Sequence, residues 1–395
     1  MADACAHVTG LLGVCVTNTG TGACNAAGAF VEALTAGTPM LHLTGQIESA
    51  YLDRDFGFIH EAPAQLAMLQ AVSKAAFRIR NPETALATLR EAHRLAFTAP
   101  CGPVSIEILI DIQASLLDLP ADMAPLAIQP IEPLASEVHA LAEKLATAKR
   151  PLLWLGGGAC GAGAEVERFV KMGWGVVTSV RRRGILAEDH PASLGSYNLQ
   201  KPADATLKNE FTAIAGRSLW WVRDITLSNS TWGNRAPMLD HPRAGAHALD
   251  GGIGQGLAMA IGASIANKVH QLGCKTVALI SDGGFMLLVG ELACALQEQA
   301  DIVMLVMNDS CYGVIKNIQD DIYGGRHCYV NLHTPDFAQF CASLKVTHFR
   351  LSTPAEATAV LQQATATSGP VVVEVDMKSW GPFAAKFAGP IVKKD

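Results

Sequence analysis

Two acidic residues stand directly after apolar, strand-like segments and could together hold a divalent cation. Asp282 closely follows the segment Thr276–Ile280, and Asp309 closely follows Ile302–Met307. Because an open α/β sheet binds its ligands at the carboxyl ends of its strands, we expect the two carboxylates to converge there. Mg²⁺ is usually held by one or two carboxylates together with phosphate oxygens and water. The pattern therefore predicts a site for Mg²⁺ and a diphosphate, although Asp is also common in ordinary turns after strands.

Glycines accompany these acids and recur in two other turns. Gly283 and Gly284 follow Asp282, and glycine lets backbone N–H groups approach a diphosphate closely. A glycine-rich segment at Gly251–Gly256 runs into an alanine-rich helix, and Thr19–Asn25 makes a similar entry into a helix near the N-terminus. Each of these two turns alone is a weak signal, because such loops also serve as plain tight turns.

The elements that position these turns alternate along the chain as short β-branched strands and alanine- and leucine-rich helices, which indicates α/β units on parallel sheets. Three blocks can be separated. The first contains strands Gly13–Thr17, Met40–Thr44 and Val104–Ile110, and helices Ala26–Thr35 and Glu83–Ala99. The second contains helix Leu134–Ala148, strand Pro151–Leu155, helix Ala164–Lys171 and strand Gly175–Val180. The third contains strands Ser218–Arg223, Thr276–Ile280, Ile302–Met307 and Val371–Val375, and helix Phe285–Gln299.

Composition limits the classes of function. With 395 residues, of which 50% are hydrophobic and 17% charged, the chain can bury a large core. A net charge of −6 and a single short basic run, Arg181–Arg183, argue against nucleic acid as a partner. We find no membrane-spanning stretch and no signal peptide, so we expect a cytoplasmic protein. The ten cysteines form no CxxC pair, which argues against a zinc site or a disulfide framework.

Taken together, Ser281-Asp282-Gly283, Asn308-Asp309 and the Gly251–Gly256 loop resemble the thiamine-diphosphate-dependent decarboxylase and carboligase family, in its acetolactate-synthase-like branch. The family motif is Gly-Asp-Gly followed, after a helix and a strand, by Asn-Asn. The resemblance covers most of the chain. It implies thiamine diphosphate and Mg²⁺ as cofactors, and an α/β fold of three doubly wound parallel-sheet domains of which the first two are incomplete. These are a partial pyrimidine-binding domain (1–115), a linker (116–133), a shortened middle domain (134–205) and a diphosphate-binding domain (206–395).

The resemblance also assigns roles to residues at the cofactor. It implies that Asp282 and Asp309 coordinate Mg²⁺ together with the backbone carbonyl of Cys311. Ile253 falls where family members carry a bulky apolar residue that bends thiamine, and the carbonyl of Gly251 would bond the aminopyrimidine. The full set of implied cofactor-binding residues is Thr19, Gly20, Asn25, Gln46, Gly251, Gly252, Ile253, Asp282, Gly283, Gly284, Asp309, Tyr312, Gly313 and Val314. Those before residue 50 would act on the cofactor of a second copy, so we expect a homodimer or homotetramer with shared active sites.

The expected substrates are small 2-oxo acids or aldehydes. His60 lies in Ile59-His60-Glu61, where relatives carry Phe-Gln-Glu, and it could donate a proton to a substrate oxygen, although a lone loop histidine is more often simply solvated. Pyruvate-decarboxylase-like relatives carry a glutamate where this chain has Ile315, and their paired histidines have no counterpart here. An apolar Ile315 would limit protonation after decarboxylation, so the resemblance favours carboligation.

Two other hypotheses remain open. The family's activating glutamate lies before the position that matches Met1, and a second gap is expected near residues 200–216, so the chain could be a non-catalytic cofactor-binding remnant. The run Gly156–Gly161 satisfies GxGxxG and could indicate a nicotinamide oxidoreductase. The acidic residue expected about 20 positions later is missing, however, and Ser179-Val180-Arg181 stands there. In the family this turn belongs to the middle domain, which binds FAD in some relatives; we do not expect FAD here.

Overall fold

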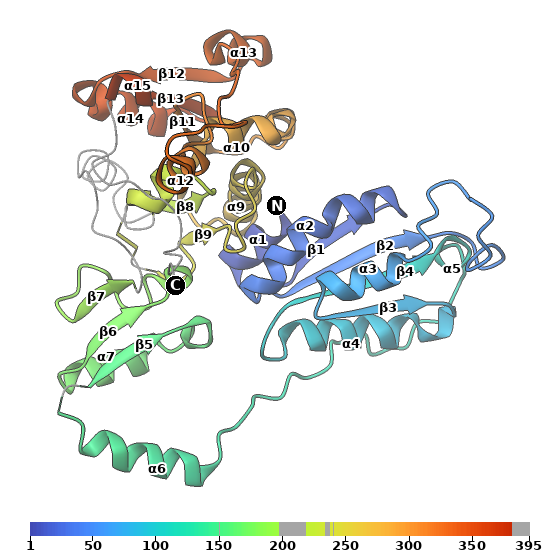
Figure 1. Cartoon of the computed structure of the whole chain (residues 1–395). Coiled ribbons are helices and arrows are strands. Elements are labelled where there is room, and N and C mark those ends of the chain that lie inside the picture. Colours follow the sequence, from blue (N-terminus) through green and yellow to red (C-terminus); the bar gives the residue numbers. More distant parts are fainter. Residues whose placement is uncertain (150, 197–218, 234–237, 240, 381–395) are drawn as a thin grey trace. The chain divides into compact units, whose positions relative to one another are not determined.

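The computed structural model describes residues 1–149, 151–196, 219–233, 238–239 and 241–380. Two compact units are present: one runs from Ala2 to Ala148, and the other comprises Met1 and Lys149–Asp395 (Figure 1). Three sheets occur in the described residues, and every strand pair in them is parallel. The predicted α/β class with three parallel-sheet domains is confirmed, whereas the exact domain boundaries stay predictions.

The Ala2–Ala148 unit is built on a four-stranded sheet in the order β1-β2-β4-β3. Its strands are β1 (Gly13–Thr17), β2 (Met40–Gln46), β3 (Ala75–Ile79) and β4 (Pro103–Leu109). Its helices are α1 (Ala2–Thr9), α2 (Thr21–Ala36), α3 (Gln65–Val72), η1 (Pro82–Thr84), α4 (Ala85–Phe97), α5 (Ile110–Gln113) and α6 (Ala135–Ala146). Leu41, Ile79, Val104 and Ile106 of the strands pack against Ala92 and Ala96 of α4, as the apolar strand pattern requires. The fully described stretch 114–134 contains no helix or strand.

One helix of this unit begins earlier than the sequence predicts. The expected start was Ala26, but α2 begins at Thr21 because Gly20, at φ 61°, turns the chain directly into the helix. Asn25 therefore lies inside the helix, where its side chain is exposed, and not near the helix start.

A three-stranded sheet, β5-β6-β7, opens the second unit. Its elements are β5 (Leu152–Leu155), η2 (Gly157–Ala159), α7 (Gly163–Lys171), β6 (Gly175–Thr178), η3 (Val180–Arg182) and β7 (Ser193–Ser196). Leu155, Val166 and Val176 form its small core. The sequence did not predict β7, because Ser-Leu-Gly-Ser lacks the β-branched residues that mark a strand. The gap expected near residues 200–216 falls outside the described residues.

A six-stranded sheet carries the rest of the second unit, in the order β12-β13-β11-β10-β8-β9. Its strands are β8 (Leu219–Arg223), β9 (Gly245–His247), β10 (Lys275–Ser281), β11 (Ile302–Asn308), β12 (Thr347–Leu351) and β13 (Val371–Asp376). The other elements are η4 (Asn229–Gly233), α9 (Gly256–His270), α10 (Asp282–Leu287), η5 (Val289–Glu291), α11 (Leu292–Gln297), α12 (Gly313–Tyr323), α13 (Phe337–Leu344), η6 (Pro354–Glu356), α14 (Ala357–Ala366) and α15 (Met377–Trp380). The central strands are buried along almost their whole length, as expected for a parallel sheet covered on both faces.

The single helix predicted over Phe285–Gln299 is wrong. The chain instead forms α10, the short turn η5 and α11. Leu288 leaves the helical region at φ −123° and ψ 24°, and Gly290, a weak helix former, lies within the turn that follows. No helix in the described part of the chain is long and apolar enough to cross a membrane.

Candidate cofactor site at the carboxyl edge of the six-stranded sheet

The two predicted acids lie at the ends of neighbouring strands. β10 and β11 pair in register, and Asp282 follows β10 while Asp309 follows β11. Asp282 accepts hydrogen bonds from the N–H of Gly283 at 2.8 Å and from the N–H of Ser310 at 2.8 Å. The turn after β11 is therefore tied directly to the carboxylate after β10, and the sheet edge brings the predicted pair together.

Ser281 gives a structural reason for one departure from the family motif. Its hydroxyl accepts the N–H of Gly284 at 3.0 Å and so caps the N-terminus of α10. Serine is among the preferred residues at this position, because it satisfies one of the unpaired N–H groups of the first helical turn. The residue that replaces the motif's first glycine thus fixes the start of the helix that carries Asp282.

Burial governs the charge of the two acids. Asp282 is fully buried, and this burial, followed by the negative charge of Asp309, raises its pKa to about 7. Burial also raises the pKa of Asp309. Removal from water disfavours a carboxylate, and a nearby like charge disfavours it further. A divalent cation would relieve both costs, so the pair has the electrostatics of a cation site.

The family resemblance assigns a role to the backbone carbonyl of Cys311 and none to its sulfur. Burial, and then the charge of Asp309, raises the pKa of the Cys311 thiol to about 12, so the thiol stays protonated. Cys311 forms an isolated bridge with Asn331, made by Tyr312 N–H to the Val330 carbonyl and Leu332 N–H to the Ser310 carbonyl, both at 2.8 Å. This arrangement leaves the carbonyl of Cys311 itself outside the bridge. Its role as a metal ligand stays a prediction.

The donor set fits Mg²⁺ with a phosphate-bearing ligand. Among the described residues, no group of three or more His, Cys, Asp or Glu side chains could hold a metal ion. Two carboxylates and one carbonyl would instead fill part of an octahedral shell. Mg²⁺ typically takes its remaining ligands from phosphate oxygens and water.

A cavity of about 320 Å³ opens beside the acids. It is lined by Ile225, Thr226, Leu227, Ser228, Gly251, Ile253, Ser281, Met307, Asp309, Cys311, Tyr312, Gly313, Val314, Ile315 and Met377. Its size and mostly apolar walls are typical of small-molecule sites. Of the predicted residues in this unit, Gly251, Ile253, Asp309, Cys311, Tyr312, Gly313 and Val314 meet at this cavity, while Asp282, Gly283 and Gly284 lie buried at the start of α10.

Asp224, at the end of β8, holds the glycine loop and was missed by the sequence analysis. Its fully buried carboxylate accepts the N–H of Gly254 at 3.1 Å and that of Gly256 at 3.2 Å, so it fixes the loop that carries Ile253. A Cβ added at Gly284 would lie 2.8 Å from its Oδ2, which requires glycine there. The signal was available, since Asp224 follows an apolar strand in the same way as Asp282 does.

We expect Asp224→Asn to change how stability depends on pH. Burial raises the pKa of Asp224 to about 6, above its unfolded value of about 4. The carboxyl therefore stabilises the fold most below pH 4, and this contribution is lost as pH rises through 6. Between pH 5 and 7 the wild type should lose roughly 1 kcal/mol of unfolding free energy relative to the variant. Urea unfolding at both pH values measures this difference, and parallel pH profiles would contradict it.

The predicted residues of the first unit lie around a different buried network. Gly20 donates its N–H to Gln65 Oε1 at 2.7 Å. The amide nitrogen of Gln65 bonds both the Gly45 carbonyl and the buried Glu107, at 2.9 Å each, and Gln46 also reaches Glu107 at 3.4 Å. The network connects Gly20 and Gln46, whose roles in cofactor binding stay predictions. Gln65 and Glu107, which hold them, were not predicted, because nothing local in the sequence links α3 and β4 to this turn.

His60 lies beside the same turn. Its side chain is exposed, its φ is 64°, and its backbone carbonyl occupies the place where a Cβ of Gly20 would stand. A side chain at Gly20 would therefore displace the loop that carries His60. Thr19 is buried next to Gly20. The catalytic role of His60 stays a prediction.

The GxGxxG run in the second block has no packing requirement for its glycines. A Cβ added at Gly156, Gly158 or Gly161 would find open space, with no described atom within 4 Å. The pattern is therefore compatible with a plain turn after β5, as its weak specificity suggested.

Comparison with known protein families agrees with the geometry of the site. Residues 1–71 match the N-terminal TPP binding domain of thiamine pyrophosphate enzymes, residues 138–212 match the central domain, and residues 228–375 match the C-terminal TPP binding domain. The chain belongs to the thiamine pyrophosphate enzyme family. Asp282, Asp309 and most of the residues that line the cavity lie within the C-terminal match.

Several named relatives are acetolactate synthases. The chain is 22% identical to acetolactate synthase 1 of Oryza sativa, over 95% of this chain and 76% of the relative. It is 33% identical to the acetolactate synthase large subunit of Corynebacterium glutamicum over 48% of this chain, and 32% identical to a protein of Pseudomonas aeruginosa named as a 2-ketoarginine decarboxylase over 50%. The latter two matches span only 31% and 35% of the relatives' own lengths.

A solved structure has the same fold. An X-ray structure described as a thiamin diphosphate-dependent enzyme from Mycobacterium smegmatis superposes with a TM-score of 0.79 at 20% identity, over 95% of this chain and 89% of that one. This similarity supports the three-domain architecture. On the three family matches and the named relatives, the chain is a thiamine-diphosphate-dependent family member of acetolactate synthase and decarboxylase type.

Proposed function

We propose that this protein binds thiamine diphosphate with Mg²⁺ and acts as a carboligase or decarboxylase on small 2-oxo acids or aldehydes. Two acids carry this proposal: Asp282, which is fully buried, and Asp309, which lines an apolar cavity. When bound, the cofactor supplies the carbon nucleophile and the electron sink that such reactions need. Asp282, Asp309 and the Cys311 carbonyl would hold the metal, and the metal would hold the diphosphate.

The chain's own side chains would then orient the reactants and exclude water. Ile253, on the loop anchored by Asp224, would support the thiamine, and Met307 and Ile315 would keep the surroundings of the reacting carbon apolar. The apolar side chains of Ile253, Met307 and Ile315 would limit protonation after decarboxylation, which favours attack on a second carbonyl. We further propose that Thr19, Gly20, Asn25, Gln46 and His60 serve the site of a second copy in a homo-oligomer, with His60 donating a proton to a substrate oxygen.

A titration followed by an assay tests the proposal. Thiamine diphosphate is titrated into the protein with and without Mg²⁺ by calorimetry, and pyruvate consumption is then measured with both present. Mg²⁺-dependent binding together with turnover supports the proposal. Binding without turnover would instead favour the alternative, a non-catalytic cofactor-binding remnant. Absence of binding would contradict both.

The apolar wall at Ile315 gives a prediction about products. We expect Ile315→Glu to place an acid in the cavity and to raise the ratio of released aldehyde to carboligated product by about tenfold or more, since positioned general acids contribute large factors to proton transfer. Ile315→Leu keeps the wall apolar and serves as the matched control. Product analysis of the pyruvate reaction measures the ratio, and an unchanged ratio in the Glu variant would remove Ile315 from the determinants of product choice.

A further inference from the structure

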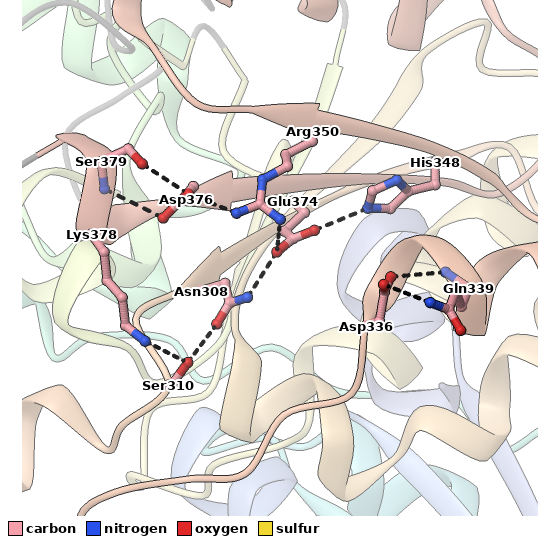
Figure 2. A network of polar contacts seen from close by, with 10 residues as sticks. All are labelled: Asn308, Ser310, Asp336, Gln339, His348, Arg350, Glu374, Asp376, Lys378 and Ser379. Atoms are coloured by element: carbon pink, nitrogen blue, oxygen red, sulfur yellow. Dashed lines mark hydrogen bonds and ion pairs between the residues drawn. The ribbon is translucent and has the colours of Figure 1, made fainter.

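A polar network lies on the far side of the turn that follows β11 and carries Asp309, away from the apolar cavity. Figure 2 shows it running from β12 through β13 to the turn after β11. Asn308 and Ser310 line a polar hollow of about 380 Å³, whereas Asp309 and Cys311 line the apolar cavity. Successive residues of this short segment thus face opposite sides. The turn is the wall between the two hollows, and its conformation decides where Asp309 lies.

Ser310 holds an uncommon backbone conformation at the centre of this wall. Its φ is 55°, in the left-handed region that residues other than glycine rarely adopt. Its N–H bonds Asp282, and its carbonyl accepts the N–H of Leu332 at 2.8 Å. Its hydroxyl donates to Asn308 Oδ1 at 3.4 Å and accepts from Lys378 Nζ at 3.1 Å. A residue stays in such an unfavourable conformation only where several contacts hold it there.

Glu374 anchors this arrangement from the next strand. Its buried carboxylate accepts the side-chain N–H of Asn308 at 2.8 Å through Oε1. The other oxygen accepts from His348 at 3.2 Å, and Arg350 lies 3.6 Å from Oε1. The hydrogen bond from His348, first among several causes, holds the pKa of Glu374 below its ordinary value, so the group stays ionised and a strong acceptor.

Asp376 secures the other arm of the network. It accepts Arg350 at 2.7 Å and the hydroxyl of Ser379 at 2.9 Å, and so fixes the short helix α15, from which Lys378 reaches Ser310 (Figure 2). Ser310 is therefore held through Asn308 on one side and through Lys378 on the other.

We propose that Glu374 is a positioning residue for the cofactor site: through Asn308 it holds Ser310 in the left-handed turn that joins Asp282 to Asp309, and so sets the affinity for Mg²⁺ without touching the ion. This inference rests on the proposed Mg²⁺ site for its effect on affinity. The positioning itself concerns only residues of this chain and can be measured in the metal-free protein.

The first measurement is amide hydrogen exchange at Ser310 and Leu332 without metal. Glu374→Leu removes the acceptor of Asn308 and should accelerate exchange at both amides by about tenfold or more. His348→Leu removes the other partner of the same carboxylate but leaves the Asn308 bond, and should change the exchange less than twofold. Unchanged exchange in Glu374→Leu, or equal acceleration in both variants, overturns the inference whatever the metal does.

The second measurement is titration of Mg²⁺ in the presence of thiamine diphosphate. Glu374→Leu should weaken Mg²⁺ binding by about tenfold, while Glu374→Gln, which keeps an oxygen acceptor for Asn308, should restore it to within twofold of the wild type. Equal weakening by Glu374→Leu and His348→Leu would mean general destabilisation and would overturn the inference. Failure of the proposed function is separately visible, because the wild type itself would then bind no Mg²⁺.

Discussion

Asp282→Ala should reduce Mg²⁺-dependent binding of thiamine diphosphate by at least about 100-fold. The carboxylate is fully buried, follows β10 directly and shares the sheet edge with Asp309. Its loss would remove a metal ligand and the acceptor of the Ser310 N–H, so the turn that carries Asp309 would loosen as well. A factor of 100 corresponds to about 2.7 kcal/mol, which is modest for the loss of a buried charged acceptor. Calorimetric titration of the cofactor with saturating Mg²⁺ measures the change.

Asp301→Ala is the matched control for this experiment. Asp301 lies directly before β11, at the amino ends of the strands and away from the cofactor site, where it pairs with Lys275 at the start of β10. The same chemical change at that edge should leave cofactor affinity within about twofold, because an ion pair with a half-exposed partner contributes little. Equal affinities for the wild type and Asp282→Ala would contradict the assignment of Asp282 as a ligand of Mg²⁺. A large loss of affinity in Asp301→Ala would indicate that such substitutions act indirectly, through folding.

The strand ends were predictable because two local rules coincide there. Thr276–Ile280 and Ile302–Met307 are apolar enough to be central strands, and each is closely followed by an acid. Parallel topology then brings the acids together without further information. The same rule applied to Leu219–Arg223 would have found Asp224, whose strand is just as buried.

The supporting contacts were not predictable, because they join residues far apart in the chain. Glu374 reaches Asn308 across neighbouring strands, and Glu107 reaches Gln46 and Gln65. No periodicity or motif marks such pairs before the strand order is known. The break of the predicted helix at Leu288 was also missed, because a single glycine such as Gly290 is often tolerated within a helix and does not by itself predict a break.

Position 309 holds Asp where the family motif has Asn, and the added charge should make the affinity for Mg²⁺ depend strongly on pH. Its charge is the second cause, after burial, of the raised pKa of Asp282, which reaches about 7. Mg²⁺ binds the ionised carboxylate, so protons compete with the metal below that pH. We therefore expect the wild type to bind Mg²⁺ about tenfold more weakly at pH 6 than at pH 8, since one proton displaced changes affinity tenfold per pH unit below the pKa.

Asp309→Asn should separate these effects. The variant keeps an oxygen for the Cys311 N–H and for the metal, but removes the charge that raises the pKa of Asp282. We expect a smaller loss of Mg²⁺ affinity between pH 8 and pH 6, measured by calorimetric titration at both values. Lower affinity at pH 8 is also expected, because the site has one negative charge fewer.

The same substitution should stabilise the metal-free protein. A carboxyl whose folded pKa lies above its unfolded value stabilises the fold at low pH and loses that contribution as pH rises through about 7. At pH 8, above the pKa of Asp282, that carboxylate is ionised in a buried place beside Asp309, so Asp309→Asn should raise the free energy of unfolding by about 1 kcal/mol without metal, as at other sites where function opposes stability. Urea unfolding with a chelator present measures this gain, and adding Mg²⁺ should reduce or reverse it. A less stable metal-free variant at pH 8 would mean that the two carboxylates do not repel each other enough to matter.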